Sequence, residues 1–287
     1  MAVSLLAHEV SDLCLGKPAL RSLSISATIR DALSVLKITG ENYISIWSCD
    51  HSSSSSSAKN DFSQECRCVG KVCMVDVVCY LCREENLSNP SSALKSPVSV
   101  LLPEVSGIIR HVEPHSSLLE VIDLILEGAQ NLIVPLKSSP RKRLLQKSSF
   151  GPTLHNGREF CWLTQEDVIR FLLSLIGLFS PIPTYSIESL DIIDTEILAI
   201  DYHDPASSAI TAISTAISQQ TSVAVIDELG KLIGEISPLT LSNCEETVAA
   251  AITTLSAGDL MAYIDCGGPP DHLVKVMKSV VLHLHHL

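Results

Sequence analysis

The sequence contains three segments that align with one another without a gap. Each segment has an apolar stretch with helical spacing, then a short polar break, and then a run of five mainly apolar residues. The equivalent positions Leu33, Ile122 and Ile213 lie 89 and 91 residues apart. This period exceeds the roughly 20–50 residues of solenoid repeats and is typical of a small folded unit that recurs. Function should therefore depend on what the three copies build together.

Each copy predicts the same order of elements: a strand, a helix, a second strand, a turn, a third strand and a second helix. The first helix of the first two copies starts with a hydroxyl residue followed three positions later by an acid, Thr28 with Asp31 and Ser117 with Glu120. That spacing satisfies exposed amide groups at a helix start. In the third copy, Gly230 fits a tight turn between two strands. The predicted fold class is α+β, built from tandem β-α-β-β-α units, two of which can cover each other's sheets.

The repeats divide the chain into four parts: residues 16–83 with a serine-rich insert, 104–178 with a basic insert, 184–264 with a helical extension, and 265–287 as a C-terminal helix. We expect the first two copies to pair and the third to have no partner copy in this chain. Because no fourth copy precedes the end of the sequence, we expect a truncated chain. The apolar face of the third copy should then drive self-association or bind a protein partner.

Composition and charge limit the classes of function. Of the 287 residues 46% are hydrophobic, and the formal net charge is −12. This charge argues against nucleic acid and anionic membrane surfaces as partners. The most apolar run, Val168 to Phe179, is shorter than the ~20 residues of a membrane helix, and the start of the chain does not resemble a signal peptide. We predict a cytoplasmic protein, with the nucleus as an alternative location, and reduced cysteines.

Five of the ten cysteines fall within residues 66–82, and Cys79 and Cys82 have the spacing of a metal-binding or redox motif. In the repeat frame these two thiols lie one turn apart on a helix, so we expect small apolar core residues and no metal site. A zinc or thiol redox role of the 66–82 cluster remains an alternative. The sequence has no Walker loop, nucleophile elbow or zinc-protease motif, and the protein is predicted not to be an enzyme.

The order of elements, an apolar strand ending at Asp227, the glycine turn, and a hydroxyl three residues before an aspartate at the last helix resemble the CBS domain, named for cystathionine β-synthase. The resemblance covers roughly residues 16–264. It is greatest to plant proteins with four such repeats, which are related to gamma subunits of SNF-type and AMP-activated kinases. It implies that repeats pair through their sheets and that adenine nucleotides bind in clefts between paired repeats.

In nucleotide-binding members of this family, a serine or threonine at the end of the last strand contacts phosphate, and an aspartate three residues later holds the ribose hydroxyls. The resemblance gives these roles to Thr164 and Asp167 in the second copy. The first copy retains the aspartate as Asp76, and the third retains the hydroxyl as Ser237. Thr164 and Asp167 also match an ordinary capping box. Because Glu166 adds negative charge, a monophosphate such as AMP is the expected ligand, and no cofactor is required.

Two functions from different classes remain open. The first is a regulatory module that senses an adenine nucleotide and modulates a protein partner such as a SNF-related kinase complex, and it depends on Thr164 and Asp167. The second is a protein-interaction scaffold whose ligand sites have decayed. The scaffold is favoured by Cys73 in place of the hydroxyl in the first copy and Thr240 in place of the aspartate in the third.

Overall fold

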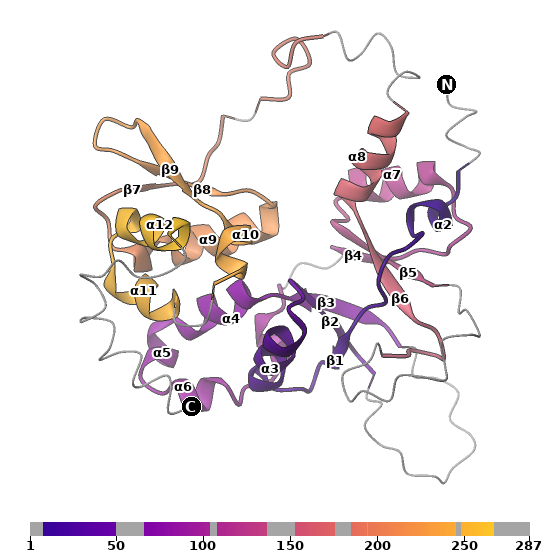
Figure 1. Ribbon diagram of the computed structural model, residues 1–287, viewed down its shortest axis with the longest axis horizontal. Helices are drawn as coiled ribbons and strands as arrows, with labels where there is room; N and C mark the ends of the chain where they lie inside the picture. Colours follow the sequence, from indigo (N-terminus) through magenta and orange to yellow (C-terminus); the bar gives the residue numbers. More distant parts are fainter. Residues whose placement is uncertain are drawn as a thin grey trace. The chain divides into compact units, whose positions relative to one another are not determined.

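The computed structural model describes residues 8–49, 66–103, 108–136, 153–175, 185–193, 195–244 and 248–266. The predicted C-terminal helix beyond residue 266 and most of both predicted inserts lie outside these residues. Within them the expected α+β class of tandem repeats is confirmed, because the same three-stranded sheet occurs three times (Figure 1).

Each sheet contains three strands in chain order. The strands are β1 (Ser22–Ser24), β2 (Ile44–Trp47) and β3 (Cys68–Val72); β4 (Ile109–His111), β5 (Asn131–Pro135) and β6 (Phe160–Thr164); and β7 (Ala199–Asp201), β8 (Val223–Ile226) and β9 (Leu232–Ile236). In every sheet the first strand runs parallel to the second. In the second and third sheets the last strand runs antiparallel to the middle one. The parallel pair requires a crossover, which the first helix of each repeat supplies.

One helix follows the first strand of each repeat and another follows the third strand. They are α3 (Ile29–Thr39) and α4 (Met74–Leu81), α7 (Leu118–Leu126) and α8 (Gln165–Ser174), and α9 (Ile210–Gln219) and α10 (Pro238–Ser242). The remaining helical segments are α2 (Val10–Leu13), α5 (Glu84–Leu87), α6 (Pro90–Ala93), η1 (Val98–Leu101), η5 (Ala206–Ala209), α11 (Val248–Thr254) and α12 (Ala257–Asp265). None of the helices in the described residues is long and apolar enough to cross a membrane.

The predicted helix starts are present. The Thr28 hydroxyl accepts a hydrogen bond from the Asp31 amide at 3.2 Å, and the Ser117 hydroxyl accepts one from the Glu120 amide at 3.2 Å. The helical extension after the third repeat consists of two helices, because Ser256 caps a new helix by accepting from the Asp259 amide. Local sequence therefore determines where these helices begin.

The compact units of the structure do not follow the repeat boundaries. The first unit contains Met1–Ser26, Ile44–Lys71 and Leu102–Ile193, and the second contains Ala27–Tyr43, Val72–Leu101 and Asp194–Leu287. The first repeat thus contributes its strands to the first unit and its helices to the second.

In the first unit the first two sheets pack against each other. Trp47 of β2 and Cys68 of β3 share one buried cluster with Ile133 of β5 and Phe160 of β6. A second cluster on the other side of β5 joins α2, α7 and α8 to the sheet. The pairing of the first two copies through their sheets, which the resemblance implies, is therefore present.

In the second unit, α4 of the first repeat packs on α9, α10 and α11 of the third repeat. The Cys82 thiol on α4's C-terminal end donates to the Ala249 carbonyl of α11 at 3.6 Å. Helices α9 and α12 cover one side of the third sheet, where Val223 and Ile236 are fully buried. The helices of the third repeat therefore have a packing partner within the chain that the repeat pattern alone did not indicate.

A short segment from a distant part of the sequence borders the start of each crossover helix. Isolated antiparallel bridges join Glu9 to Ser117, Thr28 to Pro97, and Pro205 to Ser256. The segments that supply these bridges lead into α2, η1 and α12. Because the same junction occurs in all three repeats, α12 takes the place in the third repeat that η1 has in the first and α2 has in the second.

Candidate functional site

Thr164 and Asp167 lie together at the end of β6 and the start of α8. The Thr164 hydroxyl accepts from the Asp167 amide at 3.3 Å. In return, Oδ2 of Asp167 accepts from the Thr164 amide and from the Thr164 hydroxyl, both at 2.8 Å. The two predicted site residues thus form a complete capping box, as the pattern predicted.

Lys17 lies beside Thr164 and Asp167, and no sequence pattern predicted its presence there. Its ammonium nitrogen lies 2.6 Å from Oδ2 of Asp167, and both side chains are partly exposed. Burial of the carboxyl acts to raise its pKa, but the hydrogen bonds from Lys17 and Thr164 outweigh burial and hold the pKa of Asp167 below its usual value. No local pattern marks Lys17, because it follows α2, which packs against α8 from the far end of the sequence (Figure 1).

Asn131 provides a buried amide near the same helix start. It opens β5 and pairs across the sheet with Thr164. Its side chain is only 3% exposed, and its carbonyl oxygen accepts from the Lys71 ammonium at 3.2 Å. The amide nitrogen has no hydrogen-bond partner among the described residues. A buried donor without an acceptor costs about 1–3 kcal/mol, so an acceptor atom from a ligand or a water molecule would be stabilising here.

The corresponding positions of the first and third repeats are less complete. In the first repeat, the Cys73 amide donates to Oδ2 of Asp76 at 2.7 Å, but the thiol is buried and its burial raises its pKa well above the usual value. In the third repeat, Ser237 precedes α10 and makes no side-chain cap. Helices α4 and α10 are in contact. Asp76 and Ser237 therefore belong to neighbouring helices of the second unit, and neither has the hydroxyl–carboxylate pair of the second repeat.

A pocket of about 450 Å³ in the second repeat is separate from this group. It is lined by Glu9, Glu113, Pro114, His115, Pro135, Leu136 and Arg158. Pro135 pairs with Phe160 at the start of β6, whereas Asn131 pairs with Thr164 at its end. The pocket and the Thr164–Asp167 pair consequently lie at opposite ends of β5.

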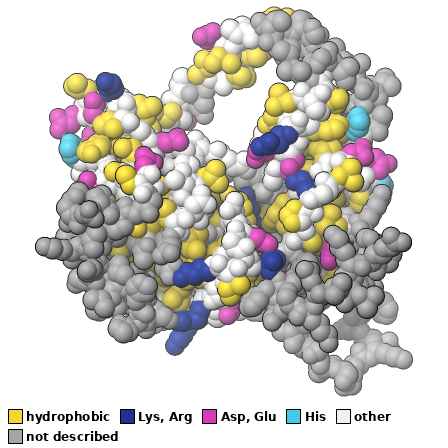
Figure 2. Space-filling model, in the orientation of Figure 1, with side chains coloured by type: hydrophobic (Ala, Val, Ile, Leu, Met, Phe, Trp, Pro, Cys, Tyr) yellow, Lys and Arg dark blue, Asp and Glu magenta, His cyan; other side chains and the backbone are white. Residues whose placement is uncertain are grey.

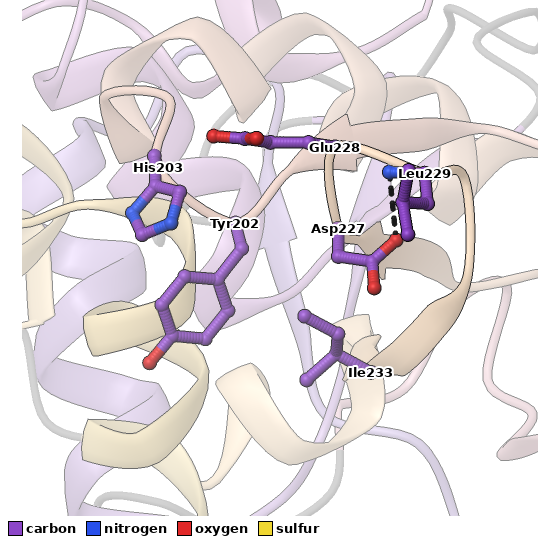
Figure 3. A pocket seen from close by; sticks show the side chains of 6 residues that line it. All are labelled: Tyr202, His203, Asp227, Glu228, Leu229 and Ile233. Atoms are coloured by element: carbon purple, nitrogen blue, oxygen red, sulfur yellow. Dashed lines mark hydrogen bonds between the residues drawn. The ribbon is translucent and has the colours of Figure 1, made fainter.

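The third repeat has a pocket of about 500 Å³ at the same place in its sheet. Tyr202 and His203 face Asp227 and Ile233 across it, and Glu228 extends over it toward His203 (Figure 3). The Asp227 carboxylate accepts from the backbone amides of the turn that follows, including that of Leu229 at 3.0 Å. Asp227 therefore holds the hairpin turn, which explains its position at the end of the strand.

Among the described residues, the cysteines of residues 66–82 do not by themselves form a group of three possible metal ligands. Cys79 and Cys82 are buried, and burial raises the pKa of each thiol to about 12. Both are protonated core residues, as expected. All ten cysteines lie in the described part of the chain, and none forms a disulfide there.

Comparison with known proteins gives close and distant relatives. No family model matches the chain. The chain is 48% identical over 291 residues to CBS domain-containing protein CBSX5 of Arabidopsis thaliana, covering 97% of the chain and 72% of that protein. It is 28% identical to CBSX6 of the same plant, covering 92% of the chain and 69% of that protein.

A third relative is the SNF1-related protein kinase regulatory subunit gamma-like PV42b of Arabidopsis thaliana. The two sequences are 23% identical over an alignment that covers 74% of this chain and 60% of PV42b. Among solved structures, protein MJ1225 of Methanocaldococcus jannaschii, described as a candidate archaeal homologue of γ-AMPK, superposes with a TM-score of 0.55. That match is 15% identical and covers 88% of this chain and 81% of MJ1225, so it supports the fold alone.

Proposed function

Because the chain belongs to the plant family of CBS domain-containing proteins, we propose that it is a non-catalytic regulatory protein. In this proposal the second repeat binds a small adenosine ligand, with AMP as the expected one, and binding changes the association with a protein partner. The observation that carries the proposal is the convergence of a hydroxyl, a carboxylate and an ammonium group at the start of α8.

The chemistry of this group suits a nucleoside monophosphate. The start of a ten-residue helix such as α8 favours an anion, because the first backbone amides and the positive end of the helix dipole face a group bound there. The Lys17 ammonium adds positive charge. The contacts to Asp167 in the described residues all use Oδ2, which leaves Oδ1 for a ribose diol. The negative charge of Glu166 is offset by Arg170, whose guanidinium donates to it at 2.7 Å.

Calorimetric titration of the full chain with AMP, ADP and ATP tests ligand binding. We expect AMP to bind, and Asp167→Ala to weaken its binding by roughly 5- to 150-fold, which corresponds to about 1–3 kcal/mol for unpaired polar groups. Asp31→Ala is the matched control, because Asp31 makes the same capping box with Thr28 at the start of α3. That variant should lose helix stability without losing AMP affinity.

Equal AMP affinity in the Asp167 and Asp31 variants would contradict the site, and absence of binding by the wild type would favour the scaffold function. The scaffold remains a second candidate for two reasons. Cys73 is a buried thiol at the position of the hydroxyl. Three residues after Ser237, Thr240 occupies the position of the aspartate.

A kinase complex is the proposed partner. The proposal is supported by the similarity to PV42b, which is named as a gamma-like regulatory subunit of a SNF1-related kinase. The β8–β9 hairpin offers an exposed apolar surface for it: Leu229 is 93% and Leu232 is 64% exposed. Figure 2 shows hydrophobic and acidic side chains intermingled over this hairpin. Self-association through the third repeat is the alternative use of the same surface.

Binding of the purified catalytic subunit of a SNF1-related kinase, measured with and without AMP, tests the partner. We expect binding, and an affinity that changes when AMP is present. Identical weak retention of the kinase by the protein and by an unrelated acidic control protein would contradict a kinase partner.

A further inference from the structure

Two cysteines and a histidine from separate parts of the sequence meet at one place in the first unit. The ligating atoms of Cys49, Cys66 and His155 all lie within 4.8 Å of one another. Cys49 follows β2, Cys66 precedes β3, and His155 lies before β6. Cys49 and His155 are buried, whereas Cys66 is partly exposed. The cluster is therefore enclosed on the protein side and open to solvent at one ligand.

The imidazole of His155 is held on both of its nitrogens. Nδ1 lies 3.1 Å from the Cys49 sulfur, and Nε2 lies 2.7 Å from the Ser22 hydroxyl. The ring stacks on Trp47, with centroids 3.6 Å apart and planes inclined by 5°. A histidine that ligates a metal through one nitrogen commonly donates from the other to a fixed oxygen, which sets its tautomer and ring orientation. Ser22 and Trp47 supply this support.

We propose that Cys49, Cys66 and His155 bind one zinc ion, with a water molecule as the fourth ligand. Two thiolates and one imidazole are a donor set that zinc prefers, in tetrahedral geometry. Around such an ion two sulfurs lie about 3.8 Å apart, and a sulfur and a nitrogen about 3.5 Å apart. The Cys49 sulfur and His155 Nδ1 are 3.1 Å apart, and neither of the other two separations exceeds 4.8 Å. On binding, the two thiol protons pass to solvent and the two thiolate charges balance the ion.

The neighbouring Cys68, in β3, is a buried thiol that does not belong to the cluster. Its sulfur donates to the Gly70 carbonyl at 3.4 Å, a hydrogen bond that requires the protonated thiol. It lies outside the cluster although only one residue separates it from Cys66. Cys68 is therefore a core thiol of β3 and not a member of the proposed ligand set.

The position of the cluster gives the proposed ion a structural role in the pairing of the first two repeats. Cys49 and Cys66 flank residues 50–65, which separate β2 from β3, and His155 lies in the connection between β5 and β6. A zinc ion would link the β2–β3 connection of the first repeat to the β5–β6 connection of the second. Because an ion that binds only the folded form stabilises it, zinc would strengthen the pairing of the first two repeats.

Cobalt titration of the chelator-treated full chain tests the proposal. We expect one equivalent of Co²⁺ to give thiolate-to-metal charge-transfer and tetrahedral d–d absorption, and Zn²⁺ to displace it. Cys49→Ala, Cys66→Ala and His155→Gln should abolish the charge-transfer band or reduce the apparent affinity at least 100-fold. Ser22→Ala should weaken binding by about 10- to 100-fold, since it removes the oxygen that orients the histidine.

Cys161→Ala is the control, because it removes a buried thiol that lies in a different core cluster, and it should keep wild-type cobalt binding. Circular dichroism of each variant identifies any that fails to fold, and the partly exposed Cys66 keeps the test informative if the buried positions do not tolerate change. Equal cobalt binding by wild type and Cys66→Ala would overturn the proposal. A Cys49–Cys66 disulfide in place of bound metal, found by peptide mapping of protein purified without chelator, would also overturn it.

Discussion

Lys17 and Asp167 form an ion pair with 2.6 Å between the ammonium nitrogen and Oδ2, although 150 residues separate them in the sequence. The pair joins the segment after α2 to the start of α8. It also means that the charge of the carboxylate proposed above as a ribose ligand is compensated by Lys17.

Lys17→Met should reduce stability by less than about 1 kcal/mol near neutral pH, because the pair is partly exposed and screened by solvent. The pKa of Asp167 is lower in the folded protein than in the unfolded chain. The contribution is thus fully present above the usual carboxyl pKa of about 3.9 and is lost as the pH falls through the folded value. Urea unfolding of wild type and variant from neutral to acidic pH measures it. A difference that grows toward acid would contradict this assignment.

Gly258→Ala should destabilise the second unit by about 1–3 kcal/mol, although the same change inside an ordinary helix stabilises by up to about 1 kcal/mol. The reason is that a Cβ at this position would overlap the Tyr202 ring. Thermal unfolding and limited proteolysis measure the effect. Tyr202→Ala in the same chain should restore part of the lost stability, and failure of that rescue would point to a different cause.

Leu232→Glu should change stability little, because the side chain is mostly exposed in the described structure, but it should weaken any association through the third sheet. Sedimentation velocity and kinase binding measure that association. Leu126→Glu, at an exposed position of α7 outside this surface, is the control for added charge. If the wild type self-associates and binds the kinase, and Leu232→Glu weakens neither interaction, the contact surface lies elsewhere.

Alkylation at neutral pH should label the exposed Cys266 first, and should label Cys79 and Cys82 only when the protein unfolds. Burial raises the pKa of both helix thiols to about 12, so the reactive thiolate is scarce in the folded state. Mass spectrometry of labelled peptides against time checks the order. Rapid labelling of Cys79 in the native protein would revive a redox role for the 66–82 cysteines.

The local features of the fold could be predicted from sequence, since a helix start such as Thr28 with Asp31 is determined by residues three positions apart. The same holds for Thr164 with Asp167. Contacts between distant segments could not be predicted. Lys17 reaches Asp167 only because α2 packs on α8, and no periodicity in either segment marks that packing.

The cysteines illustrate the same limit. The spacing of Cys79 and Cys82 suggested a motif, but helix α4 turns both into the core. Cys66 instead meets Cys49 and His155, which are 17 residues before it and 89 residues after it. Neither interval matches a metal-binding pattern, because the sheets and not the local chain bring these ligands together.

The division of the first repeat between two compact units has a consequence for how this protein can be taken apart. The backbone passes from one unit to the other five times, between residues 26 and 27, 43 and 44, 71 and 72, 101 and 102, and 193 and 194. A single cut cannot release either unit whole, and a fragment beginning at residue 194 would lack α3 and α4. Helices α3 and α4 of the second unit are joined along the chain to the strands of the first sheet, so we expect the two units to lose stability together when that sheet unfolds.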